Sequence, residues 1–152
     1  MGLIKLRRPA RLRAKLEAAI CLCLVAAGFA LPKRVLLRRW TDHALARDTG
    51  KPEDIQQAYL LARDVGAVAR RLPRKARCLQ RSLALSWMLR RRGMNSRLRF
   101  GVRNGEQGIQ AHAWIEIAGE PVNDSRDRCA VFTVLQGTER LPDAAVMAED
   151  AA

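Results

Sequence analysis

The chain has 152 residues, of which 49% are hydrophobic and 28% charged, so it is long and apolar enough for one folded domain and is not a disordered protein. Its net charge of +13 is uneven, with 25 Lys or Arg and 6 Asp or Glu in residues 1–103, against 3 and 9 in residues 104–152. Such a basic front predicts an acidic partner, but aromatics at 5% and the lack of zinc-finger, RNA-binding or leucine-zipper patterns argue against nucleic acid.

Residues 10–47 are predicted to form one or two helices, broken near Pro32. Basic residues precede an apolar run over residues 18–31, which is too short to span a bilayer comfortably. This region is expected to pack on the domain or to lie peripherally on a membrane surface. The same pattern is also typical of a cleaved signal peptide, which remains an alternative.

Three regions are therefore expected along the chain. Residues 1–47 form a basic and apolar helical region, residues 48–140 form the core domain, and residues 141–152 form an acidic, frayed tail. Within the core domain, Pro52 followed by Glu53 and Asp54 predicts the start of a helix. Its apolar spacing predicts a buried stripe that includes Tyr59 and Val65.

The stretch "KARCLQRSLALSWMLRRRG", residues 75–93, predicts an amphipathic helix that carries Cys78 in its first turn and stops at Gly93. After it, the hydrophobic period changes from 3.6 to 2, and residues 97–103 and 109–117 predict two strands joined by a turn at residues 104–108. "PVND", residues 121–124, is predicted to continue as a strand. Helices followed by a small antiparallel sheet indicate an α+β fold.

His112 and Asp124 are predicted to face each other across the second hairpin. The odd positions from Ile109 to Ile117 form an apolar core face, so His112 lies on the opposite face. If the loop is the three-residue type at residues 117–119, with Gly119 in the left-handed conformation, position 112 pairs with position 124. A two-residue loop would shift the register and separate the two side chains.

Cys78 can complete a catalytic triad with this pair. A helix N-terminus and a neighbouring imidazolium both lower the pKa of a thiol. If the helix start docks on the sheet, Cys78 is the nucleophile, His112 the general base and then the acid, and Asp124 the group that orients the imidazole. The structural alternatives are a core cysteine, a structural histidine, and turn-forming roles for Asp124 and Asp127.

The remaining cysteines, Cys21, Cys23 and Cys129, do not suggest a metal site or a disulfide framework. Cys21 and Cys23 form a C-x-C in an apolar run with no second ligand pair. We therefore expect no cofactor, no metal and a reducing, cytoplasmic setting, with membrane association through residues 1–47 as an added option.

Four segments together resemble the transglutaminase-like peptidases of lasso-peptide biosynthesis. They are "RCLQRSLAL…LRRRG" (77–93), "LRFGVR" (98–103), "AHAWIEIAGEPVND" (111–124) and "FTVL" (132–135), and the resemblance covers roughly residues 52–135. It implies a transglutaminase-like, papain-like cysteine peptidase core, with the catalytic Cys, His and Asp at Cys78, His112 and Asp124.

The resemblance also implies a reaction and partners. The family removes the leader from a ribosomally made precursor peptide, and a separate ATP-dependent cyclase then joins the freed α-amine to an acidic side chain of the core. The chain has no obvious room for a leader-recognition domain, so it resembles the split form that depends on a separate leader-binding protein.

Other site residues and other functions stay open at this point. The Cys78 N–H is expected to donate to an oxyanion, Gln80 and Gln110 are candidates for a second donor, and Trp114 and Gln110 are candidates for substrate contact. Transglutaminase-type acyl transfer to an amine is one alternative function. A non-enzymatic basic module that binds nucleic acid or an anionic membrane is another.

Overall fold

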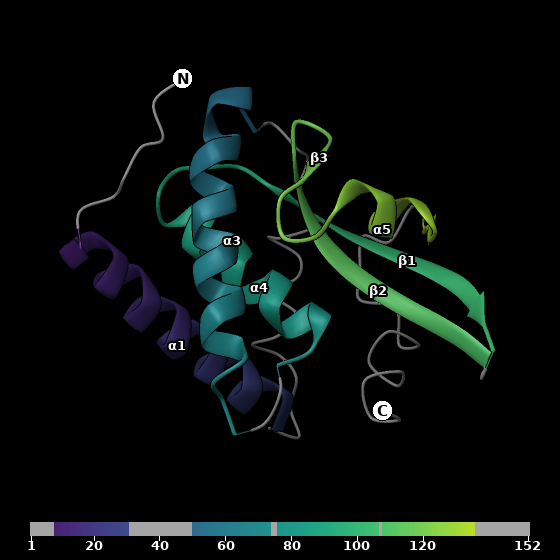
Figure 1. Cartoon of the computed structure of the whole chain (residues 1–152), viewed down its shortest axis with the longest axis horizontal. Helices are drawn as coiled ribbons and strands as arrows, with labels where there is room; N and C mark the ends of the chain where they lie inside the picture. The colour runs from purple at the N-terminus through teal and green to yellow at the C-terminus, as the bar shows by residue number, and fades with distance from the viewer. Residues whose placement is uncertain (1–7, 31–49, 74–75, 107, 136–152) are drawn as a thin grey trace.

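The computed structural model describes residues 8–30, 50–73, 76–106 and 108–135. Within these ranges α1, α3 and α4 form one side of the molecule, and a four-stranded antiparallel sheet in the order β3-β2-β1-β4, with the short α5 beside it, forms the other (Figure 1). This is the α+β arrangement that the sequence predicts. The elements are α1 (Arg8–Ala30), the 3-10 turn η1 (Pro52–Asp54), α3 (Ile55–Ala69), α4 (Cys78–Arg90), β1 (Arg97–Gly105), β2 (Gly108–Ile117), β3 (Glu120–Pro121), α5 (Arg126–Ala130) and β4 (Thr133–Val134).

Helix α4 lies at the centre of the core. It packs against α1, α3 and β2, and its residues Leu85, Met88 and Leu89 are completely buried. The helix ends at Arg90, and the turn after it closes at Gly93, the predicted stop, whose φ of +72° is a left-handed conformation that glycine adopts without steric cost. Met94 N then donates to Leu89 O at 3.1 Å, which closes the end of the helix.

Helix α1 belongs to the same core. Its buried residues Ala14, Ala18, Leu22 and Val25 pack with those of α3 and α4. The predicted packing of the N-terminal helix on the domain is therefore present in α1, whereas the break near Pro32 and the acidic tail at 141–152 lie outside the described residues. Within the described ranges, no helix has the length and apolar content needed to cross a bilayer.

The buried stripe of α3 includes the predicted Val65 but not the predicted Tyr59. Ala58, Leu61 and Val65 are buried, whereas Tyr59 is 37% exposed, so its predicted place in the core is wrong. The Tyr59 hydroxyl instead lies 3.1 Å from the carbonyl oxygen of Pro121. A tyrosine at the edge of a helix can place its ring against the protein while its hydroxyl reaches a polar partner.

Strands β1 and β2 form a long hairpin that extends away from the helices (Figure 1). Ala113, Ile115 and Ile117 of β2 face the core as predicted. Ile109 does not, because it lies near the tip of the hairpin and is 74% exposed. The part of β2 that faces the core is therefore shorter than the alternating apolar run in its sequence.

The β2–β3 connection is the two-residue turn, not the three-residue loop on which the predicted pairing of positions 112 and 124 is conditional. Ile117 pairs with Glu120, and both Ala118 (φ +50°) and Gly119 (φ +76°) are left-handed, as the favoured two-residue hairpin turn requires. β3 then ends at Pro121, and the chain bends over residues 122–124. The strand predicted over residues 121–124 is therefore wrong beyond Pro121.

Candidate active site

His112 and Asp124 lie together, with the imidazole Nε2 2.8 Å from the carboxylate Oδ2. The two-residue turn does not separate them, contrary to the sequence argument, because the chain leaves the ladder after Pro121 and bends back toward β2. Asn123 holds this bend, since its side-chain Oδ1 accepts a hydrogen bond from Ile115 N at 2.8 Å. A side chain thus takes the place of a strand carbonyl and leaves Asp124 beside the histidine.

Aromatic rings surround the imidazole, which is only 6% exposed. The Trp114 ring stacks on one side at a centroid distance of 5.8 Å, and Phe132 lies at 5.1 Å. Gly101, paired with His112 across β1 and β2, makes room for them. A Cβ atom at Gly101 would lie 2.7 Å from the Phe132 Cβ and 3.0 Å from the Trp114 ring. No pattern in the sequence indicates this requirement at Gly101.

Burial is the main influence on the charge state of His112 and lowers its pKa below the ordinary 6.5. The hydrogen bond and negative charge of Asp124 raise the pKa, but the positive charges of Arg128 and Arg81 add to the lowering. The net lowering of the pKa favours the neutral imidazole. With its Nε2–H donating to Asp124, Nδ1 is the ring nitrogen left to accept a proton.

Cys78 is the first residue of α4 and is half-buried. The turn that it opens is capped by Gln80, whose Oε1 accepts a hydrogen bond from Arg77 N at 3.0 Å. One turn further along the same face of α4, the buried Ser82 hydroxyl donates to the carbonyl of Ala113 at 3.1 Å. This bond fixes the face of α4 that carries Cys78 against β2, the strand that also carries His112.

Ser82 also connects α4 to the bend. The Asn123 side-chain Nδ2 donates to Ser82 Oγ at 2.9 Å. One serine and one asparagine thus join the helix that begins with Cys78, the strand that carries His112 and the bend that carries Asp124. Neither residue was singled out from the sequence, because the network depends on a turn length that the pattern does not fix.

Two arginines near the site were also missed. Arg128 Nε lies 3.6 Å from Asp124 Oδ2, and its position four residues after Asp124 in the chain is the signal that would have indicated it. Arg81 follows Cys78 by three residues on α4, and its charge acts on His112. The Arg81 Nε is buried, and no hydrogen-bond partner for it is found in the described part of the chain.

The residues considered for substrate contact lie in different environments. Trp114 is 1% exposed and donates from Nε1 to Glu116 Oε1 at 2.8 Å, so it supports the imidazole from within the protein. Gln110 is exposed on the hairpin, and its Oε1 accepts a hydrogen bond from Arg103 Nε at 2.8 Å. Gln80 uses its Oε1 for the helix cap.

Cys129 is close in sequence to Asp124 but is suited to remain a protonated thiol. Burial is the largest cause that raises its pKa, to about 11, and the negative charges of Asp124 and Glu116 add to the effect. Burial also raises the pKa of Cys21, whereas Cys23 is exposed. Among the residues that the structure describes, no group of three or more His, Cys, Asp or Glu side chains is placed to hold a metal ion.

Comparison with known families gives one match. A sequence model of the transglutaminase-like superfamily, Transglut_core3, matches residues 21–137, which is well over half of the chain. The match begins inside α1 and includes Cys78, His112 and Asp124. No curated protein and no solved structure matches the chain significantly.

Proposed function

Because the chain belongs to the transglutaminase-like superfamily, whose domains are typically cysteine proteases or acyltransferases, we propose that it is a cysteine peptidase that removes the leader from a lasso-peptide precursor. The observation that carries this proposal is the 2.8 Å contact between His112 and Asp124, on a strand that packs against the helix beginning with Cys78. A buried imidazole oriented by a carboxylate is suited to act as the base for a thiol nucleophile, and we assign that nucleophile to Cys78.

In the first half of the proposed reaction, His112 Nδ1 accepts the proton of the Cys78 thiol as Sγ attacks the carbonyl carbon of the scissile peptide bond. Asp124 stabilises the imidazolium that forms. The Cys78 N–H, at the positive end of the α4 dipole, is one donor to the oxyanion. When the tetrahedral intermediate collapses, the C–N bond breaks, the imidazolium proton passes to the leaving amine, and a thioester remains on Sγ.

In the second half, water completes hydrolysis. The neutral imidazole takes a proton from the water as its oxygen attacks the thioester carbonyl. The C–S bond then breaks, and the thiolate recovers the proton from His112. The products are a leader with a free carboxylate and a core peptide with a free α-amine, which is the group that macrocyclisation by an ATP-dependent cyclase needs.

The lasso-peptide assignment and its partners rest on the combination of segments from Arg77 to Leu135 that resemble these leader peptidases. We include in the proposal a separate leader-binding protein that delivers the precursor in the cytoplasm. The net charge of +13 favours an acidic peptide or protein as the approaching species. We also include in the proposal a peripheral contact of the basic N-terminal region, residues 1–47, with an anionic membrane.

Acyl transfer to an amine is the second candidate, and the same residues favour it. Both reactions pass through a thioester on Cys78, and only the acceptor that enters afterwards differs. A basic module that binds nucleic acid or membrane is the non-enzymatic candidate, supported by the charge alone. Its binding would weaken steeply with salt and would not depend on Cys78.

The deciding experiment is mass spectrometry of the cognate precursor after incubation with this protein and its leader-binding partner. Wild type is compared with Cys78→Ala and with Cys23→Ala, a matched control that removes an exposed cysteine of α1. We expect free leader and core with wild type and with Cys23→Ala, and intact precursor with Cys78→Ala. Circular dichroism of each variant confirms that the fold is retained.

The masses also separate the alternatives. Hydrolysis adds one water across the cleaved bond, whereas transfer adds the mass of the acceptor amine in place of water. Cleavage by folded Cys78→Ala would refute the nucleophile assignment. An intact precursor with all three proteins would refute leader removal from this substrate.

A further inference from the structure

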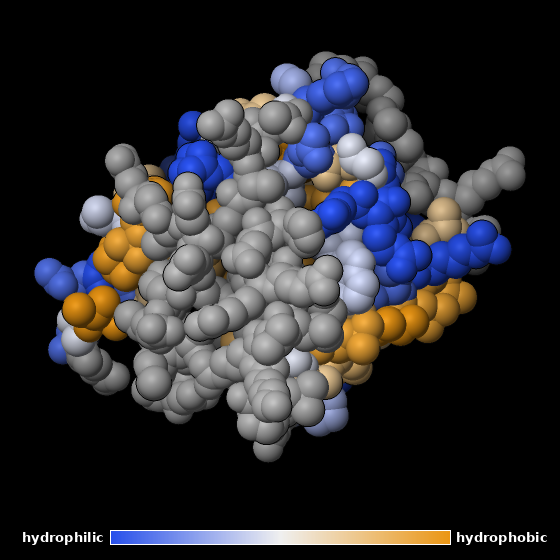
Figure 2. Space-filling view, turned by 180° about the vertical axis from the view of Figure 1, so that it is seen from behind, coloured by the Kyte–Doolittle hydropathy of each residue, from blue (hydrophilic) through white to orange (hydrophobic). Residues whose placement is uncertain are grey.

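Helix α1 has a second apolar face, which points away from the core. Leu12, Leu16, Ile20 and Leu24 are spaced four residues apart and are 43–62% exposed. They lie opposite the buried positions of the same helix, and Figure 2 shows an apolar band along this edge of the molecule, beside hydrophilic residues. A helix that is apolar on both faces is normally covered on both, so this face indicates a binding surface.

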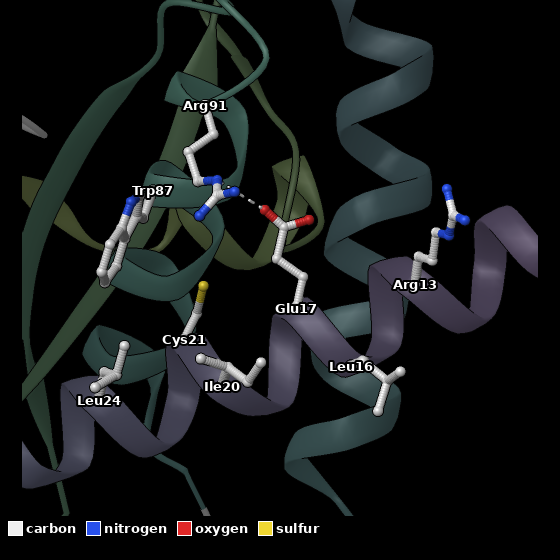
Figure 3. A pocket seen from close by; sticks show the side chains of 8 residues that line it. All are labelled: Arg13, Leu16, Glu17, Ile20, Cys21, Leu24, Trp87 and Arg91. Carbon is white, nitrogen blue, oxygen red and sulfur yellow. Dashed lines mark ion pairs between the residues drawn. The ribbon is translucent and has the colours of Figure 1, made fainter.

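A groove lies between this face and the C-terminal end of α4, with a volume of about 350 Å³ (Figure 3). Its apolar wall consists of Leu16, Ile20 and Leu24 from α1 and Trp87 from α4. Cys21 lies at its base, between the two helices. A recess of this kind accepts a protruding side chain, as the pockets that hold anchor residues at protein interfaces do.

The rim of the groove is basic. Arg13 and Arg91 line it, and the exposed Arg90 precedes Arg91 at the end of α4. Glu17 is the single acidic residue in the sequences of α1 and α4. Its carboxylate is already engaged by Arg92 at 2.6 Å and Arg91 at 3.4 Å. The surface therefore presents an apolar centre with a net positive border.

We propose that the α1–α4 groove docks a partner polypeptide segment that inserts a large apolar side chain against Ile20 and Trp87 and places acidic residues beside Arg13 and Arg91. A second copy of the chain fits less well, because it would bring two basic rims together. A flat lipid surface would cover the ridge of α1 but leave the recess beside Trp87 unfilled.

This docking surface is distinct from the catalytic centre and does not depend on the proposed function. Arg91 lies thirteen residues after Cys78 along one continuous helix, which corresponds to about 20 Å along its axis. A segment held at the C-terminal end of α4 would leave the Cys78 end open.

The test is selection of a displayed random-peptide library on the full-length protein, followed by affinity measurement of the enriched peptides. We expect enriched peptides to combine a Leu, Phe or Trp anchor with neighbouring Asp or Glu. Ile20→Gln and Arg13→Glu should each weaken their binding by roughly tenfold or more. The matched controls are Ile109→Gln, which alters an exposed isoleucine on the distant hairpin, and Arg63→Glu, which alters an exposed arginine of α3 outside the groove.

The same variants are tested on phosphatidylglycerol and phosphatidylcholine vesicles. Peptide binding that is lost with Ile20→Gln and Arg13→Glu but kept with both controls would support the proposal. Failure to enrich acidic, apolar peptides, or equal loss of binding in all four variants, would overturn it. Vesicle binding that depends on Ile20, without such peptides, would assign this face to a membrane instead.

Discussion

At the scale of single residues, the site depends on the balance between burial and charge at His112. Burial lowers the pKa of the imidazole, and Asp124 opposes this both by accepting the Nε2–H and by its negative charge. The carboxylate therefore has two separable effects. It fixes which ring nitrogen carries the proton, and it keeps the pKa of a buried base closer to the working pH.

Asp124→Asn is predicted to lower the pKa of His112 further, because both causes that raise it are removed while burial and the charges of Arg128 and Arg81 remain. The protonated form then appears only at lower pH. An NMR titration of His112 in both proteins measures the shift, with His43, the other histidine, as the internal reference. Under the proposed function, turnover also falls by roughly a hundredfold or more, since the amide orients the wrong tautomer. A His112 pKa that rises in this variant would contradict the structural assignment.

At the scale of secondary-structure elements, Ser82→Ala is predicted to loosen α4 from the sheet. The buried hydroxyl donates to Ala113 O and accepts from Asn123 Nδ2, so its removal leaves two polar groups without this partner. We expect the free energy of unfolding to decrease by about 1–3 kcal/mol. Urea denaturation measures the change.

Ser86→Ala is the matched control for this prediction. Ser86 is a buried serine one turn further along α4, and in the described residues its hydroxyl makes no bond to β2 or to the bend. Equal losses for Ser82→Ala and Ser86→Ala would show that the network does not matter. A larger loss for Ser82→Ala, together with faster exchange of the Ile115 amide, would support it, because Asn123 would no longer be held toward that amide.

The same elements show how far sequence patterns reach. The helix that carries Cys78, its stop at Gly93 and the alternation of β1 and β2 follow from local chemistry, and the sequence predicts them. The two-residue β2–β3 turn could not be predicted in this way. It needs a positive φ at Ala118, and alanine rarely adopts that conformation. The contact between His112 and Asp124 then depends on the bend and on Asn123, which are tertiary features. The sequence therefore predicts that His112 and Asp124 meet, but the bend at residues 122–124 brings them together and the expected strand register does not.

At the scale of the whole molecule, α1 is part of the folded core rather than an appendage to it. Its small and branched residues fill the space beside α3 and α4, and the family match begins within this helix. Ion pairs also join the two helices, because Arg91 and Arg92 at the end of α4 contact the carboxylate of Glu17 in α1. The helix thus connects the core to the basic groove on the outer surface.

Two leucines of α1 provide the sharpest test of this role. Leu22 is 1% exposed and lies in the core, whereas Leu12 on the same helix is 62% exposed. Leu22→Ala removes buried apolar surface and leaves a cavity, so we expect the free energy of unfolding to fall by about 2–5 kcal/mol. Leu12→Ala makes the same chemical change at an exposed position, and we expect it to alter the free energy of unfolding by less than about 0.5 kcal/mol. Both values come from urea denaturation followed by circular dichroism. If α1 were a detachable region, the two substitutions would have the same small effect, and the rest of the chain would unfold at an unchanged urea concentration. A large loss confined to Leu22→Ala means that α1 folds with the rest of the core as one cooperative unit.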